Sequence, residues 1–155
     1  MRRAAPAAAL LAALAVSTIA RAQAATHSDF GQAVAEHRSA YNIAFVEASL
    51  SVPRDGTAAS QACAGAFSGY LDLAERSLGT IEDFVQLDAL ITDPGSREAL
   101  RLYFQPRAER APAWVTLSEV PVREACATST PFLYSFEAMA RAYRALLAVM
   151  QGGTP

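Results

Sequence analysis

Two stretches of the chain repeat apolar residues every three or four positions, and this period constrains the fold more than any other feature. One face of residues 27–52 carries Phe30, Val34, His37, Tyr41, Phe45, Ala48 and Val52. One face of residues 132–150 carries Phe132, Phe136, Met139, Tyr143, Leu146 and Met150. Such steps place the residues on one side of an α-helix, and each side needs a partner to be buried. Strand-type alternation is absent, so the pattern predicts an all-α fold.

Between these stripes the sequence predicts further helical pieces, separated by Pro and Gly. A second helix fits residues 57–78, where Gly65 and Gly69 suggest the close approach of a neighbouring helix. Shorter pieces are expected after Thr80, after Ser96 and over 119–127, with 106–118 as the least regular stretch. Thr130-Pro131 is a start signal for the last helix. The compact arrangement is a four-helix-bundle-like single domain with extra short helices.

The N-terminal segment has the layout of a secretory signal peptide. A basic start precedes an uncharged, Ala-rich stretch from Ala4 to Ala20, and a small-x-small site follows. We expect cleavage after Ala24, with Ala22 as the second choice, giving a signal peptide over 1–24 and one helical domain over 25–155. The alternative is an uncleaved anchor, which usually needs a longer and more apolar stretch. We therefore expect a periplasmic or secreted protein without a stable membrane span after cleavage.

Removal of this segment makes the protein more acidic. The whole chain has 13 basic and 15 acidic residues, and three of the arginines precede the expected cut, so ten basic residues remain and the net charge becomes −5. An acidic protein without a basic cluster is not expected to bind nucleic acid. All the basic residues are Arg. The absence of Lys excludes Schiff-base, phosphate-loop and Ser-x-x-Lys chemistry.

The chain has two cysteines, Cys63 and Cys126. An exported protein with an even number of cysteines usually pairs them. The loop that this pair closes is worth about 4 kcal/mol in the chain-entropy description. A metal pair or a redox couple would be expected to show Cys-x-x-Cys spacing or a nearby His. The sequence therefore predicts one structural disulfide.

His37 is the residue on the predicted core stripes with the greatest capacity to bind a cofactor, and Met139 lies on the stripe that would face it. In residue type, this Met–His pair is similar to the ligands of the periplasmic b-type cytochromes, which hold haem with one Met and one His in a four-helix bundle. This resemblance implies a haem- or metal-binding bundle as an alternative function. The other interpretation is a hydrogen-bonded core His and a core-filling Met, with no cofactor. Cleavage after Ala24 would also make His27 the third residue of the mature chain, where a His can bind copper together with the N-terminal amine.

No spacing in the sequence indicates a catalytic residue. No Ser lies in a Gly-x-Ser-x-Gly turn, and an all-helical chain lacks the strand-to-helix turn of such hydrolases. A small exported helical enzyme is therefore a second alternative only.

Trp114 and a group of arginines, Arg101, Arg107 and Arg110, are the candidates for a partner surface. Trp and Arg are enriched at binding hot spots. Alternatively, Trp114 anchors its Pro-rich segment to the core. We expect a non-enzymatic binding protein such as an inhibitor, an immunity-type protector or an assembly accessory, with another periplasmic or envelope protein as its partner. The sequence does not indicate an oligomeric state.

Overall fold

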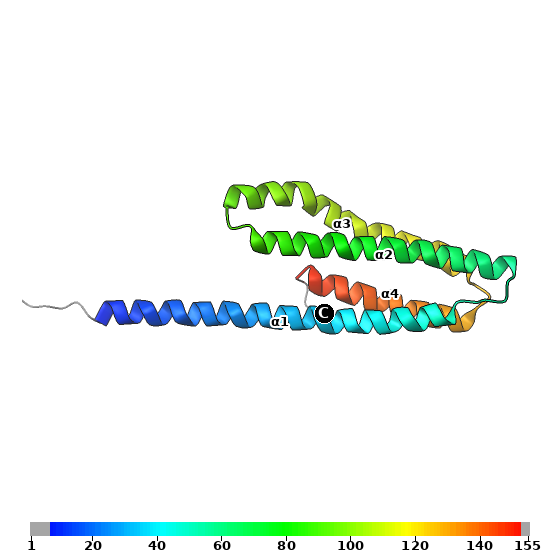
Figure 1. The fold of residues 1–155 in the computed structure, drawn as a ribbon, viewed down its shortest axis with the longest axis horizontal. Helices are drawn as coiled ribbons and strands as arrows, with labels where there is room; N and C mark the ends of the chain where they lie inside the picture. Colours follow the sequence, from blue (N-terminus) through cyan, green and yellow to red (C-terminus); the bar gives the residue numbers. More distant parts are fainter. Residues whose placement is uncertain (1–6, 153–155) are drawn as a thin grey trace, which may run out of the picture. The chain divides into compact units, whose positions relative to one another are not determined.

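The part of the chain that the structure describes consists of four α-helices without strands (Figure 1). The computed structural model covers the backbone of residues 7–152 and the side chains of residues 29–152. The helices are α1 (Ala7–Ser51), α2 (Ala58–Leu90), α3 (Pro94–Ala125) and α4 (Thr130–Met150). The all-α prediction is confirmed. Ala22, Ala24 and His27, on which the cleavage and copper predictions depend, lie outside the described side chains.

The chain divides into two compact units, residues 1–36 and residues 37–155. The boundary lies inside α1, which begins well before the predicted start at residue 27 and ends at Ser51. The four-helix bundle belongs to the second unit. The division reflects packing, and it does not test the predicted cleavage after Ala24.

Side-chain contacts establish how the helices of the bundle are paired. The rings of Tyr41 on α1 and Tyr143 on α4 have centroids 6.1 Å apart, and the hydroxyls of Ser51 and Ser135 lie 3.2 Å apart. Two such contacts in opposite order along the two helices make α1 and α4 antiparallel. α1 also contacts α2, because the phenol of Tyr41 donates a hydrogen bond to Glu75 (3.2 Å).

The aromatic part of the core joins α2 to α4. Phe67 contacts Phe132 with ring centroids 5.1 Å apart, and Tyr70 contacts Phe136 at 5.0 Å, both edge-to-face. These contacts follow the same order along both helices, so α2 and α4 run parallel. α2 also packs along α3. The largest fully buried side chains come from all four helices: Tyr41, Tyr70, Leu78, Val115, Val122, Phe132, Phe136, Met139, Tyr143 and Leu146. The predicted bundle is confirmed.

The predicted break at Gly79-Thr80 does not occur, because α2 continues to Leu90. Leu78 and Ile81, on either side of the predicted break, are both buried in the core, and this packing outweighs the cost of an interior glycine, about 1 kcal/mol. Thr80 does not cap a new helix, and its hydroxyl donates to the carbonyl of Arg76 (2.8 Å) within α2.

The close helix approach predicted at Gly65 and Gly69 is wrong. A Cβ placed at either position would meet no atom within 4 Å, and both residues are exposed.

The stretch expected to be irregular, residues 106–118, lies inside the continuous helix α3. Pro106 and Pro112 each remove one backbone donor from this helix, which bends part-way along its length (Figure 1). Leu100, Ala108 and Val115 are nevertheless buried on one face of it. This common buried face holds the two sides of the prolines in one helix, so the expected extra short helices are parts of α2 and α3.

Candidate functional site

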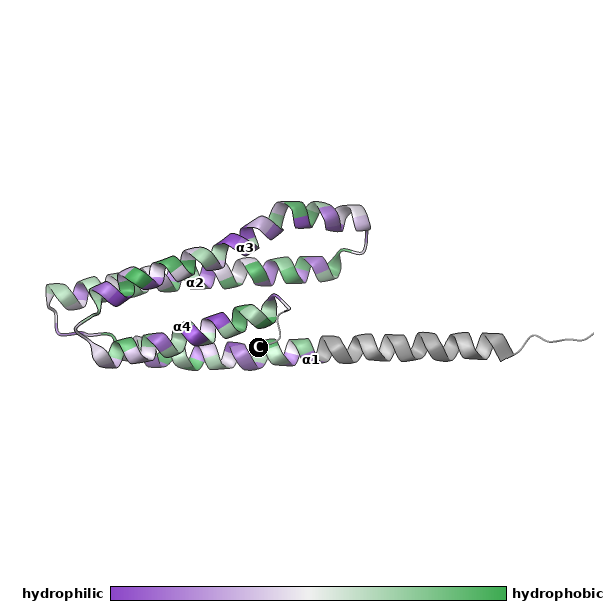
Figure 2. Ribbon diagram, turned by 180° about the vertical axis from the view of Figure 1, so that it is seen from behind, coloured by the Kyte–Doolittle hydropathy of each residue, from purple (hydrophilic) through white to green (hydrophobic). Residues whose placement is uncertain are grey.

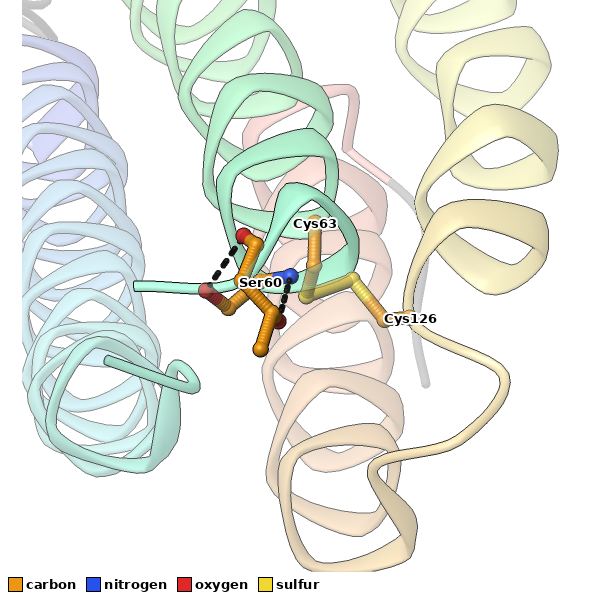
Figure 3. Close-up of a disulfide and its surroundings, with 4 residues drawn as sticks. Ser60, Cys63 and Cys126 are labelled. Atoms are coloured by element: carbon orange, nitrogen blue, oxygen red, sulfur yellow. Dashed lines mark hydrogen bonds between the residues drawn. A yellow bond between two sulfur atoms is a disulfide. The ribbon is translucent and has the colours of Figure 1, made fainter. Parts of the chain in front are cut away.

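The disulfide joins the first turns of α2 to the residue that follows α3 (Figure 3). Cys63 and Cys126 are both buried, with Cα atoms 4.8 Å apart. Thr57 caps α2 beside them, since its hydroxyl accepts a hydrogen bond from the backbone N–H of Ser60 (3.1 Å). The bond that the sequence predicted is thus present, and no described cysteine is free. The pair holds two helices together.

The candidate partner residues share α3, and most of them form one exposed surface. Trp114 is 62 % exposed and Tyr103 is 61 % exposed, so Trp114 does not anchor its segment to the core. Helical spacing places them beside Arg107, Arg110 and Leu117, on a face distinct from the buried one. We call these five residues the arginine–aromatic stripe. Figure 2 shows hydrophobic and hydrophilic residues interleaved along α3.

Two arginines of this stripe have no carboxylate partner among the side chains that the structure describes. Arg107 places its guanidinium carbon 4.2 Å from the centroid of the Tyr103 ring, a cation–π arrangement. Neither Arg107 nor Arg110 forms an ion pair with any side chain in the described range. Arg101 differs, because its Nε lies 3.3 Å from a carboxylate oxygen of Asp88. The structure therefore groups Arg107, Arg110 and Trp114 and assigns Arg101 to a separate ion pair.

The structure does not bring His37 and Met139 to the same level of the bundle. Met139 is fully buried on α4, whereas His37 is half-buried on α1. The antiparallel register, set by the Tyr41–Tyr143 contact and by the two serine hydroxyls, places Met139 roughly 13 Å along the bundle from His37. Both residues lie on the predicted core faces of their helices. A helical stripe shows which face of a helix is buried, but it does not show the position along the bundle at which two residues meet.

Among the described side chains, no group of three or more His, Cys, Asp or Glu residues is placed to hold a metal ion. Within the same part of the chain, no helix combines the length and the apolar content needed to cross a membrane.

The sequence predicts burial of Tyr41 and Tyr143, but sequence reasoning did not single out the polar hydroxyls that such residues bring into the core. Tyr41, Tyr70 and Tyr143 are all buried, as is Ser77. Burial raises the pKa of Tyr143 to about 12, and it raises the pKa of Tyr70 and of Tyr41 further, with the Glu75 carboxylate adding to the effect at Tyr41. Among the side chains that the structure describes, the hydroxyl of Tyr70 meets no hydrogen-bond partner. The signal was present for Tyr41 and Tyr143, because each is a polar group on a stripe that the sequence predicts to be buried.

The buried carboxylate of Glu119 is the second feature that the sequence did not reveal. Its two oxygens accept hydrogen bonds from Arg123 and from Arg144 on α4, each at 2.6 Å. Arg123 also donates to Glu137 (2.6 Å), and this hydrogen bond lowers the pKa of Glu137. The four residues join α3 to α4 near the disulfide end of α3. They form a satisfied ion network, and such networks are typical of structural contacts.

No protein-family model, no curated protein and no solved structure matches this chain. Its function must therefore be inferred from its own residues.

Proposed function

We propose that this chain is an exported, non-enzymatic binding protein that engages a protein partner through the arginine–aromatic stripe of α3. The observation that carries the proposal is the grouping of Trp114, Tyr103 and two arginines without carboxylate partners on one exposed helix face. Trp, Tyr and Arg are the residues most enriched among binding hot spots.

The charges of the stripe favour a partner with acidic groups. Arg107 and Arg110 form no ion pair with a side chain of residues 29–152, although the chain as a whole carries a net negative charge. A partner surface with carboxylates beside an apolar side chain would pair both arginines and cover Trp114. Export is supported by the signal-peptide layout of the N-terminal segment and agrees with the disulfide, because disulfides persist in oxidising compartments. The proposed partner is therefore another periplasmic or envelope protein.

The test uses the chain as bait in a periplasmic extract, followed by measurement of the dissociation constant for the recovered protein. The double variant Trp114→Ala with Arg110→Ala removes the centre of the stripe. We expect it to weaken binding by roughly thirtyfold or more, as truncation of hot-spot residues does. We also expect binding to weaken as salt is raised.

The matched control is Tyr134→Ala with Arg141→Ala, which removes one exposed aromatic and one exposed arginine from α4. We expect this control to bind as the parent chain does. Equal binding by parent, test and control variants would refute the proposal. So would the lack of any reproducible partner, or binding of the stripe to anionic lipid vesicles alone.

A further inference from the structure

A pocket opens to the surface of the bundle where α4 ends. Tyr70 packs against Phe136, and α2 and α4 run parallel, so Met150 lies at about the level of residue 84 on α2. α2 continues to Leu90 before the chain turns into α3. The hairpin of α2 and α3 therefore extends past the last turn of α4 (Figure 1), and its inner face has no α4 residue opposite it there.

This open pocket has a volume of about 580 Å³. Apolar side chains from three helices form its floor and walls: Ile81, Phe84, Val85, Ala108 and Met150. The volume falls within the range of about 300 to 1,000 Å³ that is usual for small-molecule sites. Because apolar surface in contact with water is unfavourable, this lining favours an occupant with an apolar body.

At one end of the pocket, the carboxylate of Asp88 faces two guanidinium groups: that of Arg101, which lines the pocket, and that of Arg97, which does not. Arg101 Nε lies 3.3 Å, and Arg97 Nε 3.7 Å, from the same oxygen of Asp88, so two guanidinium groups face one carboxylate. Arg97 is also held by the backbone, since its Nη2 donates to the carbonyl of Ile91 (2.6 Å). The Nη groups of Arg101 have no partner within the described residues, and this side chain is 48 % exposed. Arg101 can therefore accept an anion at the mouth.

The opposite end of the mouth is acidic. Glu109 lies eight residues after Arg101 on α3, or about 12 Å along the helix. One oxygen of Glu109 accepts a hydrogen bond from Gln105 (2.8 Å), and its charge repels an anion at that end. An anionic group is therefore favoured at Arg101, whose charge offsets that of Asp88, over the end that carries Glu109.

We propose that this cavity binds a small amphipathic carboxylic acid, with its apolar chain against Phe84 and Met150 and its carboxylate on Arg101. The planar guanidinium presents paired N–H donors that match the two oxygens of a carboxylate. This site is separate from the arginine–aromatic stripe, because none of the stripe residues lines the cavity.

Isothermal titration calorimetry with three ligands of equal chain length tests both parts of the site. Octanoate, octylamine and octanol each contain eight carbons and differ in the charge of the head. We expect octanoate to bind at least about tenfold more tightly than the other two, because only it can pair with the free donors of Arg101. Lengthening the acid should tighten binding, by up to about fourfold for each added CH₂.

Two variants with matched controls on the same helix separate the head from the chain. Arg101→Gln should reduce the affinity for octanoate to that for octanol and leave octanol unchanged, whereas Arg107→Gln should change neither. Ala108→Leu fills the cavity and should weaken all three ligands by about tenfold or more. Its control, Ala113→Leu on an exposed part of α3, should not weaken the binding of any of the three ligands.

The proposal is overturned if octanoate and octanol bind equally to the parent chain, or if octylamine binds most tightly. It is also overturned if Ala108→Leu, shown to be folded by circular dichroism, binds as the parent does. If Ala108→Leu fails to fold, the exposed Arg101→Gln variant decides the outcome, because an unchanged preference for octanoate in that variant excludes Arg101 as the anion site.

Discussion

Three glycines in the interior of α2 should limit the stability of the bundle. A Cβ added at Gly65, Gly69 or Gly79 meets no atom within 4 Å, and none of the three has a positive φ. Replacing an interior helical Gly by Ala stabilises a helix by about 0.8 to 1 kcal/mol, chiefly by lowering the entropy of the unfolded chain. The three sites share no neighbouring side chain, so their effects should add to about 2.5 kcal/mol.

The assay is urea denaturation of the single and triple Gly→Ala variants, followed by far-UV circular dichroism. We expect the triple variant to raise the free energy of unfolding by about 2.5 kcal/mol and the melting temperature by about 8 °C. The matched control is Gly56→Ala, in the turn before α2. There too a Cβ would meet no atom, but φ is +78°, so Ala should destabilise the protein.

The reasoning is refuted if Gly65→Ala or Gly69→Ala lowers stability. A loss of stability that grows with protein concentration would show that another molecule packs against this face of α2. A loss that is independent of concentration would show that α1 or α3 approaches these glycines more closely than the structure has them.

Three further predictions test the core and its ion pairs. Replacing both Cys63 and Cys126 by Ala should lower the free energy of unfolding by about 4 kcal/mol in urea titrations, because the bond spans 63 residues; a loss below about 1 kcal/mol would contradict this. Tyr70→Phe should leave stability unchanged or raise it by up to about 1 kcal/mol, since the phenol is buried without a partner; a clear loss in the same assay would reveal a hidden hydrogen bond. Arg123 lowers the pKa of Glu137, so the pair stabilises the fold above the unfolded-state pKa of this carboxyl, and that stabilisation is lost as pH falls through its folded-state pKa. Glu137→Gln should therefore flatten the decline in stability between neutral and acidic pH. An unchanged decline would show that this pair does not cause it.

The sequence predicted the helical faces well because burial follows the helical period. The last stripe is buried from Phe132 to Met150. Of the first stripe, Tyr41 and Ala48 are buried as expected, most of the others are half-buried, and Phe30 is 37 % exposed. The disulfide was also predictable, because two cysteines allow only one pairing.

The continuity of α2 and α3 was not predictable from local signals. Gly79 and Pro106 both disfavour helix locally, but the side chains before and after each of them are buried against other helices. Such tertiary contacts come from residues distant in sequence. A window of neighbouring residues does not contain them.

The same limit applies to the candidate sites. Glu119 is buried because Arg144 reaches it from α4. No local sequence pattern on α3 indicates that Arg144 is its partner. His37 and Met139 lie on the predicted faces, but the register of α1 against α4 separates them. Side-chain periodicity indicates which way a residue points and leaves open which residues meet.

The disulfide has a further consequence for how the protein responds to proteolytic cleavage. Together with the turn over residues 91–93, it closes α2 and α3 into a covalent ring from Cys63 to Cys126. The tip of this ring extends past α4, where the backbone is most open to cleavage. A single cut there leaves one molecule with two new ends, held by the bond at the other end of the hairpin. Such a nicked chain would migrate as one species on a non-reducing gel and separate into two fragments only after reduction.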